Sequence, residues 1–180
     1  MTLFKYLTPI FTATLLNASF SLVAHANIEV RFVEGAPKDE FLIQNTGQCS
    51  IKQFTLDIDL SSSEGNLIFD TTNAGQGVEV FQPFEATSGQ FELISQTNGN
   101  EVKDGDNTLS LKVPEIKPQQ VISFTIDVDD KLENSQLGQI QVTGSEIKGA
   151  LAKLNINQEN FSSGPFGKNN KAIVTVPSCA

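Results

Sequence analysis

The sequence predicts an all-β protein, an antiparallel β-sandwich of immunoglobulin-like type. Three observations lead to this prediction. Apolar and polar residues alternate over many short segments, Gly, Asn and Pro separate these segments at regular intervals, and hardly any stretch has the period of a helix. Short strands joined by frequent turns are typical of a sandwich of two antiparallel sheets.

The predicted strands follow one another with turn-forming residues between them. A Gly-rich turn lies at 73–77, a polar loop at 96–107, and a proline turn at 114–118. Residues 158–170 have neither periodicity nor a core pattern, which predicts a mobile loop before the last strand. We expect strands at residues 28–35, 40–47, 51–60, 66–72, 78–85, 89–95, 108–113, 120–130, 137–144, 146–156 and 171–177.

Two of these strands resemble each other: residues 54–60 read FTLDIDL, and residues 124–130 read FTIDVDD. Successive side chains of a strand point to opposite faces, so one face of each strand is apolar and the other carries Thr and Asp. The residues expected in the core are Phe54, Leu56, Ile58, Phe124, Ile126 and Val128. Those expected to face outward are Thr55, Asp57, Asp59, Thr125, Asp127 and Asp129.

The first 26 residues have the pattern of a secretory signal. Lys5 precedes an apolar run, and the small-residue pattern Ala24-His25-Ala26 indicates a cleavage site. The apolar run is too short and too interrupted to span a membrane. We therefore expect residues 1–26 to be removed, and residues 27–180 to form a single domain secreted to the periplasm or outside the cell.

The composition excludes several classes of function. The only His, His25, and the only Tyr, Tyr6, lie in the expected signal, and the chain has no Trp. Without His, the secreted part can form neither a Ser-His-Asp triad nor an imidazole-ligated metal site. The formal net charge of −9 repels phosphate backbones, so nucleic acid is not expected as a partner. We do not expect an enzyme.

The two cysteines, Cys49 and Cys179, are predicted to form a disulfide. An even number of cysteines in a secreted chain is typical of disulfide pairing. The bond would join the loop after the second predicted strand to the end of the chain. A catalytic thiol is not expected, because no His remains to activate it.

Carboxylates gather at four places in the predicted fold: Asp57 and Asp59 share a strand face, Asp70, Glu79 and Glu85 flank the Gly-rich turn at 73–77, and two further groups are candidate ligands. Asp127, Asp129 and Asp130 end one strand, and Asp104 and Asp106 lie in a turn-rich loop. Calcium takes about six to eight oxygen ligands, several of them carboxylates. We therefore predict a calcium site at the strand end, with this loop folded over it. Two alternatives stay open: a solvated strand face that binds no cation, and a carboxylate pair acting as a glycoside hydrolase.

Four runs of the sequence carry a resemblance to a known family: VRFVEGAPKDEFLIQNTGQCSI (30–51), LIFDTTNAGQGVEVFQPFE (67–85), DGDNTLSL (104–111) and FTIDVDD (124–130). They resemble small secreted bacterial proteins labelled aggregation factor core proteins. The label refers to the core protein of the sponge aggregation factor, a complex that assembles cells in a calcium- and carbohydrate-dependent way. The resemblance implies an extracellular, non-enzymatic β domain that binds a partner or self-associates, and it implies no catalytic residues.

These features together predict a calcium-dependent interaction or adhesion module outside the cell. Its partner would be a protein or glycan at the cell surface, or a second copy of the chain, because one weak site in one domain provides no avidity. The alternative is a periplasmic ligand-binding or accessory domain without an adhesive role.

Overall fold

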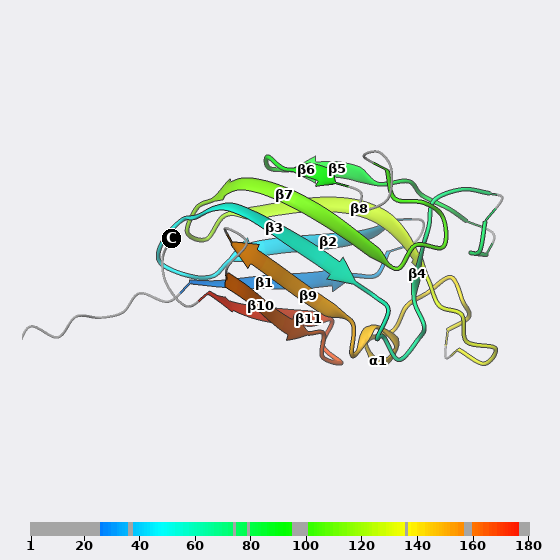
Figure 1. Cartoon of the computed structure of the whole chain (residues 1–180). Helices are drawn as coiled ribbons and strands as arrows, with labels where there is room; N and C mark the ends of the chain where they lie inside the picture. The colour runs from blue at the N-terminus through cyan, green and yellow to red at the C-terminus, as the bar shows by residue number, and fades with distance from the viewer. Residues whose placement is uncertain are drawn as a thin grey trace, which may run out of the picture.

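A computed structural model confirms the predicted fold class: the protein is an all-β sandwich of two antiparallel sheets (Figure 1). The immunoglobulin-like arrangement of its strands stays a prediction. The structure describes residues 26–35, 38–73, 75–78, 80–94, 101–135, 137–156 and 160–176.

The first sheet has the strand order β11-β1-β2-β8-β4, and β5 also pairs with β8. Along β8, one edge pairs with β2, and the other edge pairs with β5 and then with β4. This sheet therefore places β4 directly beside the acidic end of β8. Its strands are β1 (Ala26–Val33), β2 (Asp39–Asn45), β4 (Ile68–Asp70), β5 (Glu85–Ser88), β8 (Val121–Asp129) and β11 (Lys171–Val176).

The second sheet has the order β10-β9-β3-β7-β6. Its strands are β3 (Ile51–Asp59), β6 (Glu92–Ile94), β7 (Thr108–Ile116), β9 (Leu151–Ile156) and β10 (Asn160–Pro165). The short helix α1 (Gly144–Ile147) precedes β9. It begins where the Glu146 carboxylate accepts a 2.6 Å hydrogen bond from Thr143 N–H, as in a capping box.

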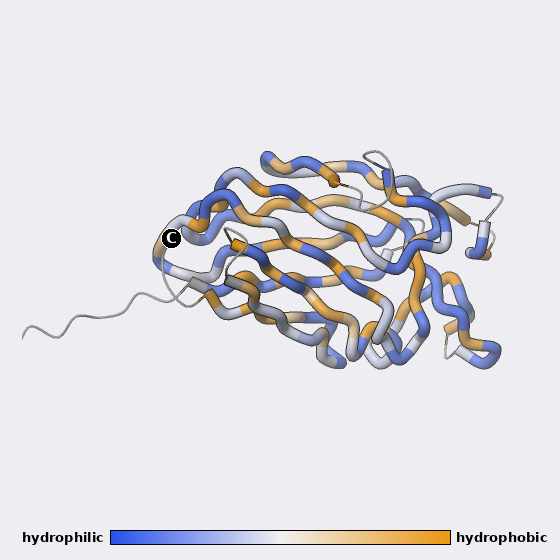
Figure 2. The backbone as a smooth tube through the Cα atoms, in the orientation of Figure 1, coloured by the Kyte–Doolittle hydropathy of each residue, from blue (hydrophilic) through white to orange (hydrophobic). Residues whose placement is uncertain are grey.

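The inward faces of both sheets form one hydrophobic core. Figure 2 shows hydrophobic and hydrophilic residues alternating along the strands. Phe124 lies at the centre of an aromatic group, with its ring centroid 5.1 Å from that of Phe41 and 5.0 Å from that of Phe84. The prediction for the core is confirmed, because all six of its members are buried: Phe54, Leu56, Ile58, Phe124, Ile126 and Val128.

Two predicted strands are wrong. Residues 80–84 are not a strand, and β5 begins only at Glu85; Pro83 has no N–H with which to extend a ladder. The described part of residues 137–144 forms turns that lead into α1, with Gly138 at a φ of +85°. Alternating composition resembled a strand in both places, but turn chemistry and tertiary pairing decided otherwise.

The boundaries of other elements also differ from the prediction. β10 occupies Asn160–Pro165, inside the stretch 158–170 that was expected to be a loop. Its sequence, NFSSGP, has no apolar alternation, and it is a strand because it pairs with β9 along its whole length. β7 continues through Pro114, which lies beyond the residues paired with β6, so its missing N–H breaks no hydrogen bond to that strand.

Other predictions concern residues outside the described ranges. Cys49 packs against the core, but Cys179 lies outside those ranges, so the disulfide stays a prediction. The same holds for the secretory signal, of which only Ala26 is described. Across the described ranges, no helix has the length and apolar character needed to cross a membrane.

Candidate cation site

The acidic end of β8 faces a third carboxylate from the neighbouring strand. Asp127 and Asp129 lie on the same face of β8, and the antiparallel register places Asp70 of β4 directly opposite Asp127. Like charges directly opposite each other on adjacent strands destabilise a sheet. The pairing of β4 with β8 therefore concentrates negative charge, and a proton or a cation is needed to relieve it.

These three carboxylates converge and are buried. One oxygen of each lies within 4.8 Å of an oxygen of the other two. Their residues are only 1–4% exposed, although sequence alternation placed Asp127 and Asp129 on an outer, solvated face. In the described part of the chain, three of their buried oxygens have no hydrogen-bond partner: Asp70 Oδ1, Asp127 Oδ2 and Asp129 Oδ1.

The backbone at Gly77 and Val78 covers the carboxylates. Val78 N–H donates a 2.7 Å hydrogen bond to Asp129 Oδ2, which leaves Oδ1 of the same carboxylate for another partner. A Cβ atom at Gly77 would overlap the carboxylates of Asp70 and Asp129, so only glycine permits this close approach. A cavity of about 490 Å³ lies beside the cover and is lined by Gly77, Val78, Gln139 and Ile140.

The electrostatics of the cluster follow from this geometry. Burial raises the pKa of Asp70 to about 7, and the contact with Asp104 and the charge of Asp129 add to the shift. Burial, together with the charges of Asp129 and Asp70, raises the pKa of Asp127 to about 7 as well. The pKa of Asp129 is raised mainly by burial. The protein thus holds these carboxylates where their ionised forms are poorly solvated and repel one another.

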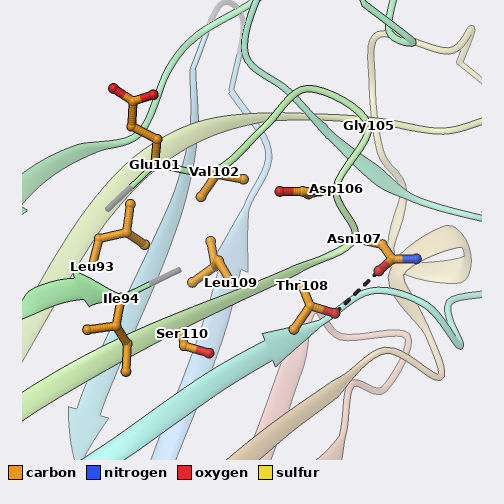
Figure 3. Close-up of a pocket in the computed structure, with 10 residues that line it drawn as sticks. All are labelled: Leu93, Ile94, Glu101, Val102, Gly105, Asp106, Asn107, Thr108, Leu109 and Ser110. Carbon is orange, nitrogen blue, oxygen red and sulfur yellow. Dashed lines mark hydrogen bonds between the residues drawn. The ribbon is translucent and has the colours of Figure 1, made fainter. Parts of the chain in front are cut away.

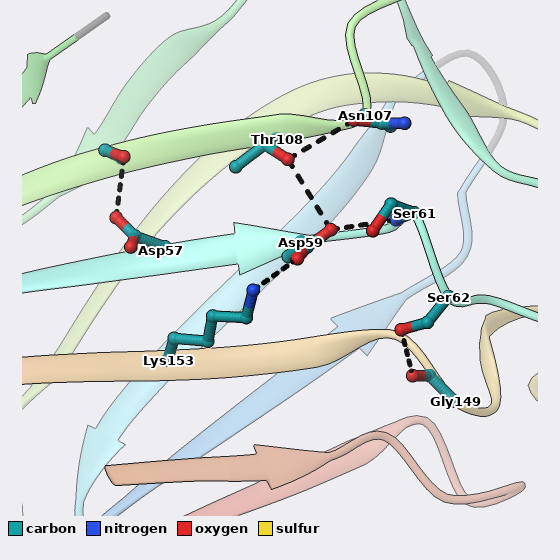
Figure 4. Close-up of polar contacts among 9 residues, drawn as sticks. Asp57, Asp59, Ser61, Ser62, Asn107, Thr108, Gly149 and Lys153 are labelled. Atoms are coloured by element: carbon teal, nitrogen blue, oxygen red, sulfur yellow. Dashed lines mark hydrogen bonds and ion pairs between the residues drawn. The ribbon is translucent and has the colours of Figure 1, made fainter. Parts of the chain in front are cut away.

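The carboxylates of β3, whose sequence resembles that of β8, have hydrogen-bond and ion-pair partners (Figure 4). Asp59 forms an ion pair with Lys153 of β9, with 2.5 Å between Nζ and Oδ2. Burial raises the pKa of Asp59, but the bonds from Lys153 and Ser61 outweigh it, so the pKa is lowered overall. Asp57 accepts a 2.6 Å hydrogen bond from Ser110. The two similar sequences therefore have opposite environments: β3 supplies partners to its carboxylates, and β8 gathers carboxylates together.

Asp104, a predicted ligand, lies next to the cluster. Its carboxylate contacts that of Asp70, but both of its oxygens already accept hydrogen bonds. Oδ1 accepts from Gln76 N–H at 2.6 Å, and Oδ2 accepts from the N–H groups of Thr71 and Thr72 at 3.2 and 3.0 Å. Burial raises the pKa of Asp104, and these bonds together with the contact to Asp70 outweigh that effect and lower it overall.

The other two predicted ligands are not among the carboxylates that converge in the described residues. Asp106 accepts a 2.9 Å hydrogen bond from Lys103 N–H in its own turn, and it lines a different pocket of about 220 Å³ (Figure 3). Asp130 accepts a 2.8 Å bond from Leu132 N–H. Burial and the charge of Glu146 raise the pKa of Asp130, and the charge of Asp130 in turn adds to the raised pKa of Asp129. The structure therefore brings together Asp127 and Asp129, and it brings neither Asp130 nor Asp106 to them.

In the sequence, Asp70 is one of the carboxylates around the Gly-rich turn, but it is not among the predicted ligands. It ends β4, whose three residues are too few to show a period. One indication of its role is present in the sequence: Asp70 lies between an apolar run and the Gly-rich turn at 73–77, where glycine lets the backbone approach a side chain closely. Only the pairing of β4 with β8 shows that Asp70 faces Asp127.

No protein-family model, curated protein or solved structure matches the chain.

Proposed function

We propose that this chain is a secreted, non-enzymatic β-sandwich domain that binds a divalent cation, calcium, through Asp70, Asp127 and Asp129, and that it acts as a calcium-dependent interaction module. One observation carries the proposal. Three buried carboxylates converge, and each has a buried oxygen without a hydrogen-bond partner among the described residues. Buried polar atoms are nearly always paired, so three unpaired carboxylate oxygens that converge on one place are well suited to bind a cation.

The donor set favours calcium. All three side chains offer hard carboxylate oxygens, which calcium, magnesium and manganese prefer. Calcium accepts irregular shells of about six to eight oxygens, whereas magnesium demands a near-ideal octahedron. Three carboxylates held on two strands do not by themselves form an octahedron, which favours calcium over magnesium. Water or backbone carbonyl groups would supply the remaining calcium ligands.

The spacing of the carboxylates is less suited to hydrolysis. Glycoside hydrolases hold their two carboxyl groups about 5–9.5 Å apart, so that a sugar fits between acid and base. In this cluster, oxygens of all three carboxylates lie within 4.8 Å of one another beneath the backbone of Gly77 and Val78. This arrangement suits a small ion better than a sugar ring.

The adhesive role rests on the resemblance of the sequence to aggregation factor core proteins and on the pattern of a secretory signal. A single domain of this size has to bind a partner or a second copy to connect cells, because one weak site provides no avidity. The periplasmic accessory domain remains the alternative proposal. The cation site belongs to both, so binding of calcium is tested first.

Calcium is expected to raise the melting temperature of the wild-type protein by several degrees, and a chelator should reverse the rise. An ion that binds only the native state contributes about 2.7 kcal/mol at a hundredfold excess over Kd. Asp127→Asn should abolish most of this response. In calcium-free buffer at pH 8, the same variant should melt at a higher temperature than wild type, because it removes one of the mutually repelling charges.

The matched control is Asp57→Asn. Asp57 lies at the equivalent position of β3 and accepts a hydrogen bond that asparagine can also accept. This variant should keep the full calcium response. If millimolar calcium leaves the wild-type melting curve unchanged, or if Asp127→Asn responds as strongly as wild type does, the proposed function is wrong.

A further inference from the structure

The carboxylate of Asp104 organises the backbone that covers the candidate cation site. It accepts four hydrogen bonds from this segment: from Thr71 N–H, Thr72 N–H, the Thr72 hydroxyl and Gln76 N–H. The fit is close, since a Cβ atom at Gly75 would overlap the Asp104 carboxylate. The Asp104 side chain therefore fixes the backbone both before the Gly-rich turn, at Thr71 and Thr72, and within it, at Gln76.

The same segment reaches the proposed ligands two residues further on. Gly77 packs against the carboxylates of Asp70 and Asp129, and Val78 N–H donates a hydrogen bond to Oδ2 of Asp129. That hydrogen bond fixes the rotation of the Asp129 carboxylate, and with it the direction of the unpaired Oδ1. Any shift of the backbone at Gln76 would pass to both contacts.

We propose that Asp104 is a positioning residue of the cation site, and that it couples binding of the cation to the conformation of the backbone at Thr71, Thr72 and Gln76–Val78. This inference rests on the proposed function. Asp104 is assigned a positioning role because its carboxylate is not one of the three that converge, and both of its oxygens accept hydrogen bonds from the covering backbone. Coupling of this kind is reciprocal: a bound cation stabilises the segment, and an ordered segment strengthens binding of the cation. Groups that orient metal ligands typically change affinity about 10–100-fold when they are removed.

Three single variants of the full secreted domain separate positioning from charge. Asp104→Asn removes one negative charge and disturbs the hydrogen bonds. Asp106→Asn removes one negative charge from the same loop, but among the described residues the Asp106 carboxylate accepts its hydrogen bond from Lys103 N–H, within its own turn. Gly75→Ala changes no charge and pushes against the Asp104 carboxylate from an exposed position.

Calcium affinity would be measured by isothermal titration calorimetry at 0.1 M and 0.5 M KCl. Both Asp104→Asn and Gly75→Ala are expected to weaken binding about tenfold or more, while Asp106→Asn stays within about twofold of wild type. The loss in Asp104→Asn should persist at 0.5 M KCl, where interactions between exposed charges are screened. Hydrogen exchange of the Gln76 and Val78 amides should slow on calcium binding in wild type, and much less in Asp104→Asn.

The outcomes separate this inference from the proposed function. A wild-type protein that does not bind calcium overturns both. Calcium binding by wild type with equal losses in Asp104→Asn and Asp106→Asn, or with no loss in Gly75→Ala, overturns only the positioning role. If Asp104→Asn does not fold, Gly75→Ala decides the question, because its added methyl group disturbs the same contact on an exposed turn.

Discussion

In calcium-free buffer, the protein is expected to be more stable at pH 5 than at pH 8, with a melting temperature several degrees higher. Three buried carboxyl groups cause this. The pKa values of Asp70 and Asp127 are raised to about 7, as described above. Burial and the charge of Glu34 raise the pKa of Asp39 to about 9; its carboxyl group is 1% exposed and accepts a 2.9 Å hydrogen bond from Val128 N–H.

The sign follows from proton linkage. The unfolded chain loses these protons near pH 4, whereas the folded protein keeps them until about pH 7 for Asp70 and Asp127 and about pH 9 for Asp39. Between these limits the native state binds more protons, so the free energy of unfolding falls as pH rises. Ionising the cluster therefore destabilises the fold, most steeply up to about pH 7 and more gradually beyond.

Thermal melts between pH 5 and pH 8 in calcium-free buffer, with and without added calcium, would measure the effect. Calcium should restore stability most strongly at pH 8, where protons no longer neutralise the cluster. Asp127→Asn should flatten the dependence on pH, and Asp57→Asn should not. A melting temperature that rises steadily from pH 5 to pH 8 without calcium would contradict the electrostatic description of the site.

Replacing Phe124 by alanine is expected to cost about 3–5 kcal/mol of unfolding free energy, the range for truncating a buried phenylalanine. Phe124 is fully buried on β8, and its ring contacts Phe41, Phe84 and Phe91 at centroid distances of 5.0–6.4 Å. The cavity would lie between the two sheets, where several rings lose a neighbour at once. Urea denaturation followed by circular dichroism would measure the loss.

Phe161→Ala serves as the control for this variant. Phe161 lies on β10 and is 73% exposed, so its truncation should change the unfolding free energy by no more than about 0.5 kcal/mol. Equal losses in the two variants would show that the group around Phe124 is not the centre of the core.

Local alternation predicted much of the fold because a strand repeats every two residues. It placed Phe54 and Phe124 in the core and placed strands over most of β1, β2, β3, β7 and β8. Prediction was less successful where pairing between distant segments decides the structure. β10 has no apolar period and is a strand only because β9 lies beside it. Residues 80–84 contain Val80, Phe81 and Phe84, residue types that favour strands, but they do not form a strand.

The sequence by itself determined which face of β3 and of β8 packs into the core, and it indicated that carboxylates accumulate at the end of β8. It could not determine what those carboxylates meet. Asp59 is neutralised by Lys153, and Asp127 faces Asp70, and both partners are distant in the chain. The repeats FTLDIDL and FTIDVDD look alike because the side-chain direction of a strand is local. Burial acts to raise the pKa of both Asp59 and Asp127, but tertiary pairing gives them different neighbours, so the pKa of Asp59 is lowered overall and that of Asp127 is raised. Charges interact according to their distance in space, whatever their separation along the chain.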